Sequence, residues 1–164
     1  MMELRSDLKN KPELVKAILT ASCDKKYNES LTSGLTAQEG AGKINARCAI
    51  WILSMNRFYA STMSTGSVSK SFAVTSSDSM IRAAAAWMRP NTGTLSSPYT
   101  SSSAVHPNMQ LQLIRPNGTS TTNVTNSSVE LIHYVTNGNT GTYTAKITRM
   151  DGGSNSFRFA IAWR

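Results

Sequence analysis

Two segments in the first third of the chain carry apolar residues at the spacing of an α-helix. The first begins at Pro12, which suits the first turn of a helix because a backbone N–H there would have no partner. The second follows Asn45, whose side chain can cap a helix N-terminus. Their apolar positions are Leu14, Val15, Ile18 and Leu19 in the first, and Ala46, Ala49, Ile50 and Leu53, flanked by Cys48, Trp51 and Ile52, in the second. We predict a pair of α-helices within residues 1–57.

The pattern changes near Phe58 to short segments with the two-residue period of strands. In the last of them, Phe157, Phe159 and Ile161 alternate with small or polar residues. The segments predicted as strands are 67–75, 80–88, 109–115, 128–135, 142–149 and 156–163. Turn-forming residues separate them at 89–91, 115–118, 137–139 and 151–153.

These segments predict a mainly β chain. We expect an antiparallel, jelly-roll-like β-sandwich over residues 58–164, preceded by the helix pair of residues 1–57. A polar loop is predicted at 24–36. The Ser- and Thr-rich stretch 91–107 is predicted as a surface loop that crosses between the sheets.

The 164 residues carry a net charge of +8, but the cations are scattered. Lys25-Lys26 is the only adjacent basic pair, whereas a phosphate-binding surface needs a stripe of cations that displaces counterions. We therefore expect no nucleic-acid partner. No apolar run approaches the roughly 20 residues of a membrane span, and the first residues show no signal-peptide segment. We also expect no membrane partner and no export signal in this chain.

The two cysteines, Cys23 and Cys48, do not form a disulfide framework. Both lie in helix-like segments, and we predict buried free thiols, with a disulfide as the alternative. The sequence has no Cys-x-x-Cys pair and no Cys/His cluster, which argues against a zinc site. His106 and His133 are far apart and lack ligand spacing, so we interpret each as a surface or strand residue and not as a catalytic base.

The glycine-containing stretch 39–49 is the most specific local motif. Gly40 and Gly42 permit a tight turn before the helix that Asn45 caps. A dinucleotide-binding loop would need a third glycine and a preceding strand, and a P-loop would need Ser or Thr after Lys43. We interpret the stretch as the structural start of a helix.

The same stretch, Gly-Ala-Gly-Lys-Ile-Asn-Ala-Arg-Cys-Ala at 40–49, resembles the segment that opens the last helix of the catalytic domain in subtilisin-like serine peptidases (subtilases). The upstream segment 12–22 is similar to a preceding helix of that domain. Residues 80–163 resemble the β-sandwich often fused after it. The motifs that match are 81–87, 108–118, the glutamate at 130, Gly-x-Tyr at 141–143 and the closing strand at 157–161.

The resemblance implies the C-terminal portion of a longer enzyme. Residues 1–57 correspond to the last helices of its catalytic domain, and residues 58–164 to an accessory sandwich. The parent would be a secreted or cell-associated serine endopeptidase, with the remainder of the catalytic domain as the partner of this chain. The chain would stabilise that domain or help to position protein substrates.

The catalytic motifs of the family have no counterpart in this sequence. Subtilases use Asp, His and Ser in separate motifs, with the nucleophile in Gly-Thr-Ser, whereas Ser30, Ser33 and Ser64 lie in ordinary loop contexts. A serine hydroxyl needs an oriented base and an oxyanion hole to attack a peptide bond. We therefore expect no catalytic residue and no peptidase activity in this chain.

Two amides replace an acidic pair of the family. Asn108 and Gln110 stand where relatives have Asp-x-Asp, and Asp78, Glu130 and Asp151 are the only acids of residues 58–164. A calcium site would lack charged oxygen ligands. We predict no metal site and no cofactor, with calcium as the less favoured alternative.

A second class of function is an independent module that binds carbohydrate or a cell-surface polymer. Its candidate binding residues are Tyr99 in the predicted loop and Tyr134 and Tyr143 on strands. Exposed, coplanar aromatic rings would favour this class over a purely structural role, because the sandwich fold by itself does not define a function.

The apolar helix faces need a cover, since the parallel sheet of a subtilase is absent. We expect the helices to pair with each other and to dock on the sandwich or on a second copy, as a homodimer. The residues expected to be buried in this way are Val15, Ile18, Leu19, Ile50, Trp51 and Leu53.

Overall fold

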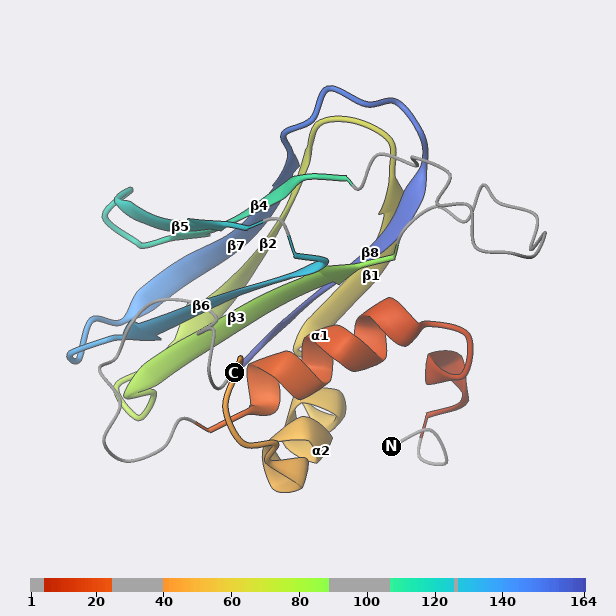
Figure 1. Ribbon diagram of the computed structural model, residues 1–164. Helices are drawn as coiled ribbons and strands as arrows, with labels where there is room; N and C mark the ends of the chain where they lie inside the picture. The colour runs from red at the N-terminus through yellow and green to blue at the C-terminus, as the bar shows by residue number, and fades with distance from the viewer. Residues whose placement is uncertain (1–4, 25–39, 89–106, 126) are drawn as a thin grey trace.

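The computed structural model describes residues 5–24, 40–88, 107–125 and 127–164 (Figure 1). This part of the chain is mainly β, with two antiparallel four-stranded sheets in the orders β1-β8-β3-β6 and β2-β7-β4-β5. The strands are β1 (Phe58–Met63), β2 (Ser67–Val74), β3 (Met80–Trp87), β4 (Met109–Ile114), β5 (Ser120–Val124), β6 (Val129–Val135), β7 (Gly141–Arg149) and β8 (Phe157–Trp163). The predicted fold class, an antiparallel β-sandwich that follows two helices, is confirmed.

Two of these strands, β1 and β5, were not predicted. Strand β5 consists of Ser-Thr-Thr-Asn-Val, which has no apolar periodicity. Strand β1 is partly buried along most of its length and shows no two-residue alternation of burial. Each lies at the edge of its sheet, where only one neighbour and a solvated flank constrain the residue types.

Two α-helices precede the sheets, α1 (Pro12–Ser22) and α2 (Ala46–Ser54), after a short 3-10 helix at Ser6–Leu8. Pro12 occupies the first turn of α1, and the side chain of Asn45 accepts a hydrogen bond from the Cys48 N–H at 3.0 Å. Gly40 and Gly42 have positive φ angles of 58° and 100°, as the tight turn requires. The loops predicted at 24–36 and 91–107 lie almost entirely outside the described residues.

The core between the sheets is built from the inward side chains of both. Trp87 and Tyr143 are among its largest fully buried residues, and Phe72 stacks on Trp163 with ring centroids 5.2 Å apart. The remaining buried members are Met63, Val74, Ile81, Ala83, Ala85, Met109, Leu111, Leu113, Ile132, Ala145, Ile147, Phe157, Phe159 and Ile161. Phe157, Phe159 and Ile161 of β8 therefore face the core, as their alternation with small or polar residues predicts.

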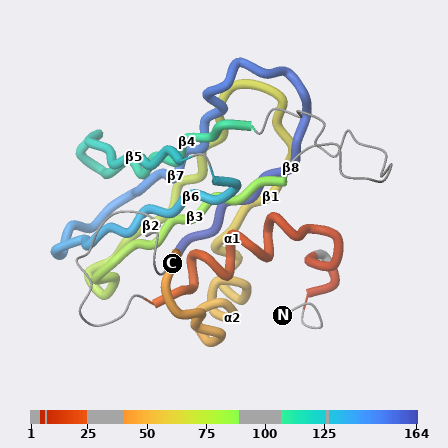
Figure 2. Tube along the Cα trace, in the orientation of Figure 1, coloured from red at the N-terminus to blue at the C-terminus, as the bar shows by residue number. Residues whose placement is uncertain are grey.

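The outer face of the β1-β8-β3-β6 sheet is covered by α1, and α2 packs against α1 (Figures 1 and 2). Four buried alanines form the centre of this face, because Ala84 pairs with Ala162 and Ala86 pairs with Ala160 across β3 and β8. Their small side chains let the helix approach the sheet closely. The helical residues buried in the same cluster are Leu14, Ala17, Ile18, Ala21, Ala49, Ile52 and Leu53. The prediction that the helices pair and dock on the sandwich is confirmed.

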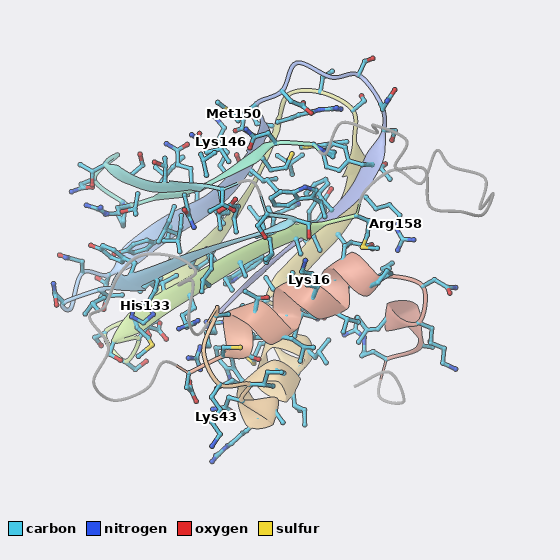
Figure 3. All side chains as sticks on the ribbon, viewed as in Figure 1. Lys16, Lys43, His133, Lys146, Met150 and Arg158 are labelled. Carbon is cyan, nitrogen blue, oxygen red and sulfur yellow. The ribbon has the colours of Figure 1, made fainter. Side chains whose placement is uncertain are left out.

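Polar contacts fix α1 on the sheet at two points. Arg158 on β8 donates from Nη2 to the buried Oε1 of Glu13 at 2.7 Å. Lys16 donates from Nζ to Oγ of Ser128 at 2.6 Å. Figure 3 shows Arg158 above the beginning of α1 and Lys16 near the middle of the helix. The helix is thus held by charge as well as by apolar contact.

The expected burial of α2 was only partly correct. Leu53 is buried, but Ile50 is 48% exposed and Trp51 is 38% exposed. The cause is geometric: within the described residues, α2 packs mainly against α1, so only the side with Ala49, Ile52 and Leu53 is covered. The opposite side of the helix faces outward.

Candidate binding site at the turn end of the sandwich

Two turns meet at one end of the sandwich and enclose a cavity. The β4–β5 turn begins at Arg115, and the β6–β7 turn spans 136–140; both lie at the left in Figure 1. The cavity has a volume of about 190 Å³. It is lined by Arg115, Pro116, Asn117, Tyr134, Asn139, Thr140 and Tyr143.

Gly141, the first residue of β7, allows the two turns to approach. Its φ of 127° is unfavourable for residues with a side chain. A Cβ atom at this position would lie 2.9 Å from Cγ of Pro116. The cavity wall therefore depends on a glycine at this position.

Replacement of Gly141 by alanine is expected to lower the free energy of unfolding by about 1–3 kcal/mol, through backbone strain and the contact with Pro116. Gly138→Ala is the matched control, because Gly138 also has a positive φ, of 80°, but a methyl group there would meet no atom of the described residues within 4 Å. Urea denaturation should give a larger loss for Gly141→Ala. Equal losses would show that the turns can move apart freely.

Arg115 is the positive group of the cavity. Its guanidinium lies over the ring of Tyr134, with Cζ 4.8 Å from the ring centroid. Nη1 donates to Oγ1 of Thr119 at 3.1 Å, and Nη2 donates to Oγ1 of Thr121 at 2.8 Å. The ring and the two hydroxyls hold the guanidinium in one orientation.

Two of the three tyrosines predicted as binding residues reach this cavity. Tyr134 on β6 is half-buried and Tyr143 on β7 is fully buried, with the ring planes tilted by 48° at a centroid distance of 6.1 Å. The Tyr143 hydroxyl donates to the carbonyl oxygen of Asn139 at 3.2 Å, and burial raises the pKa of Tyr143. The rings do not form a flat exposed platform. Tyr99 lies outside the described residues.

Chemically, the cavity combines one cation with neutral hydrogen-bonding groups and two apolar surfaces, Pro116 and the Tyr134 ring. Such a mixture suits a small polar ligand better than an apolar one. Arg115 was predicted only as part of a turn. Arg115 follows β4 and Tyr134 lies on β6, and these strands belong to different sheets. The contact between the two residues therefore depends on the packing of the sheets, which no local sequence motif predicts.

The two amide residues Asn108 and Gln110 lie at the start of β4. Gln110 is half-buried on the strand, and the Asn108 carbonyl accepts a hydrogen bond from the Met150 N–H at 2.8 Å. Asp151 is the next residue after Met150. Its carboxylate accepts hydrogen bonds from Nε and Nη2 of Arg149. Arg149 therefore supplies the positive charge beside this carboxylate.

Arg149 also joins two loops. Its Nη1 donates to the carbonyl oxygens of Ser64, after β1, and Asn155, before β8. Its Cζ lies 5.2 Å from the centroid of the Phe157 ring. The side chain is only 5% exposed and that of Asp151 is 11% exposed, so this ion pair is largely shielded from solvent.

The other two acids of the sandwich lie elsewhere and have their own partners. Asp78 accepts a hydrogen bond from the Thr75 N–H at 2.7 Å, and this bond lowers the pKa of Asp78. Glu130 is fully buried, and its Oε1 accepts bonds from the N–H and Oγ1 of Thr125; burial raises the pKa of Glu130. Among the described residues, no three His, Cys, Asp or Glu side chains gather as a metal site.

The histidine and cysteine side chains lie near the helices. His133 is buried on β6, with Nδ1 3.5 Å from Nη1 of Arg82, so its interpretation as a strand residue is confirmed. Cys23 and Cys48 are free thiols, the first buried and the second half-buried, and burial raises the pKa of the Cys23 thiol. Arg164 donates to Sγ of Cys48 at 2.8 Å. Predicted residues outside the described ranges are His106, Ser30 and Ser33.

No helix in the described ranges is both long enough and apolar enough to cross a membrane. No protein-family model matches the chain, and no curated protein matches it.

Proposed function

We propose that this chain is the non-catalytic C-terminal region of a subtilisin-like serine peptidase, which stabilises the catalytic domain or helps to position protein substrates. The proposal starts from the resemblance of 12–22 and 40–49 to the closing helices of that domain and of 80–163 to the fused sandwich. The packing supports it, because the segments with the first resemblance form helices docked on the sandwich.

The observation that carries the proposal is the outward side of α2 and the turn before it. Its large exposed apolar residues are Ile44 (59% exposed), Ile50 (48%), Trp51 (38%) and Met55 (54%). Basic side chains at Lys43, Arg47 and Arg57 border them, and Lys43 is labelled beside α2 in Figure 3. Grouped apolar side chains of this size mark interaction surfaces. We assign this outward face of α2 to the catalytic domain, which should offer an apolar surface bordered by acidic residues.

The coding sequence directly upstream tests the origin of the chain. We expect an in-frame segment with separate Asp, His and Ser motifs of a subtilase. The 164-residue chain alone is expected not to cleave casein. An unrelated upstream gene, or cleavage of casein by the chain alone, would refute the proposal.

Two substitutions test the docking surface. Ile50→Ser and Trp51→Ser should each weaken binding of the chain to the purified catalytic segment by about tenfold or more, since central apolar contacts dominate an interface. Met150→Ser is the control, because Met150 is 50% exposed but follows β7 on the sandwich. Sedimentation velocity gives both affinity and oligomeric state. Loss of a homodimer in the two α2 variants, without binding to the segment, would assign the face to a second copy.

We also infer that the sandwich is a jelly roll. In that topology eight strands form two four-stranded sheets through two Greek keys. The pairings β1 with β8, β2 with β7, β3 with β6 and β4 with β5 support this inference, because they are those of one long hairpin wrapped into two sheets.

A second candidate function is carbohydrate binding. The cavity that joins Tyr134 and Tyr143 with Arg115 favours it, since two residues expected to bind sugars meet there. Screening of the chain against a glycan array should detect binding if this function is present. If no glycan binds, carbohydrate binding is refuted and only the accessory role remains proposed.

A further inference from the structure

Among the described residues, no carboxylate neutralises the positive group of the cavity between the two turns. Within the described part of the chain, Arg115 is the only charged residue that lines it. The three acids of residues 58–164 bond elsewhere: Asp78 to Thr75, Glu130 to Thr125 and Asp151 to Arg149. A guanidinium with hydroxyl partners alone keeps its full charge and favours an anionic ligand.

The guanidinium still has donors to offer. Thr119 and Thr121 use two of the five N–H donors of an arginine. Nε is shielded from solvent and has no hydrogen-bond partner among the described residues. Each terminal nitrogen keeps one further N–H, so the guanidinium can still donate to a carboxylate.

The rest of the lining is neutral and suits hydroxyl groups. Asn117, Asn139 and Thr140 have side chains that can donate and accept hydrogen bonds. Oδ1 of Asn117 already accepts from Thr119, which leaves its amide N–H groups available. Pro116 supplies apolar surface for the C–H face of a sugar ring, whereas the Arg115 guanidinium covers one face of the Tyr134 ring.

The size of the cavity limits the ligand to about one ring. Its volume of about 190 Å³ lies below the range of about 300–1,000 Å³ of drug-sized ligand pockets. The two tyrosine rings are tilted relative to each other and Tyr143 is fully buried, so they provide no extended platform for several sugar rings. A single sugar unit at the end of a polymer, or one that projects from it, is small enough for this cavity.

We propose that this cavity binds one carboxylate-bearing sugar unit, such as a hexuronate of an acidic polysaccharide. The carboxylate contacts Arg115, and the ring hydroxyls contact Asn117, Asn139 and Thr140. This inference rests on the second candidate function, carbohydrate binding, and names the ligand class of the same site.

Titration of the 164-residue chain with methyl β-D-glucuronide tests the proposal. NMR shifts of the backbone amides in 115–119 and 136–141 should move and saturate. Methyl β-D-glucoside and sodium acetate should each bind at least about tenfold more weakly, since one lacks the charge and the other lacks the ring. Affinity for the glucuronide should fall as salt is added.

Variants separate the site from general effects of charge. Arg115→Gln should reduce affinity for the glucuronide by about tenfold or more, and Arg47→Gln, at an exposed arginine of α2, should not change it. Thr140→Val removes a hydroxyl from the exposed part of the lining and should weaken binding severalfold. It serves as the test if Arg115→Gln does not fold.

Each outcome decides a different part of the proposal. Equal binding of glucoside and glucuronide would overturn the acidic ligand and leave carbohydrate binding intact. Equal binding of acetate and glucuronide would reduce the site to an anion site. Absence of binding by all three probes would refute carbohydrate binding at this cavity, whereas the accessory role, tested through α2, would be unaffected.

Discussion

Replacement of Arg149 by methionine is expected to lower the free energy of unfolding by about 3–5 kcal/mol, because it leaves the largely shielded carboxylate of Asp151 without its cation. The variant also loses the bonds from Nη1 to the carbonyl oxygens of Ser64 and Asn155. Urea denaturation at neutral pH measures the loss. Arg47→Met, on the exposed side of α2, is the control and should change stability by less than about 0.5 kcal/mol.

The same pair predicts a pH dependence with a definite sign. The hydrogen bond from Arg149 holds the pKa of Asp151 below its usual value. The stabilisation is therefore fully present above the pKa of the unfolded carboxyl, about 3.9, and is lost as the pH falls through the lower pKa of the folded state. The difference between the native chain and Arg149→Met should shrink on acidification. A difference that stays constant down to the acid transition would contradict the ion pair.

Replacement of Ile18 by alanine is expected to lower the free energy of unfolding by about 2–5 kcal/mol, since Ile18 is fully buried between α1 and the sheet. Val124→Ala is the control, because Val124 is 46% exposed on β5, and its change should stay below about 0.5 kcal/mol. Urea denaturation measures both.

The unfolding curves of Ile18→Ala also test how helices and sandwich are coupled. Circular dichroism reports on the helices. Tryptophan fluorescence in a Trp51→Phe background, which keeps Trp87 and Trp163 in the core between the sheets, reports on the sandwich. Coincident transitions by both probes are expected, because the helices and the outer sheet share one apolar cluster. Loss of the helical signal before the change in core fluorescence would instead support two separately stable units, divided near residue 57.

The elements with a regular period could be predicted from the sequence. Pro12, Asn45 and the alternation of 156–163 mark helix and strand positions by purely local chemistry, and the structure has them there. The polar edge strand β5 has no such period, so only its pairing with β4 makes it a strand. The sequence pattern therefore predicts the elements with a regular period, but it does not predict an edge strand such as β5.

The outer sheet face and the cavity depend on contacts that a sequence pattern does not contain. In β3, Ala83 and Ala85 face the sandwich core while Ala84 and Ala86 face the helices, so the same residue type lies on both sides and no alternation is visible. The cavity arises where Arg115 of one sheet meets Tyr134 of the other. From the sequence, Arg115 is predicted only as a turn residue and Tyr134 only as a strand residue.

The position of β8 has a consequence for synthesis. Strand β1 pairs only with β8 within its sheet, and α1 rests on the same strand. Both α1 and β1 precede β8 in the chain, so part of their apolar sides stays uncovered until β8 has been synthesised. Such delayed closure is slow and exposes a nascent chain to aggregation. Early release of the chain before residue 157 should yield an insoluble product, even though most of the strands have been made.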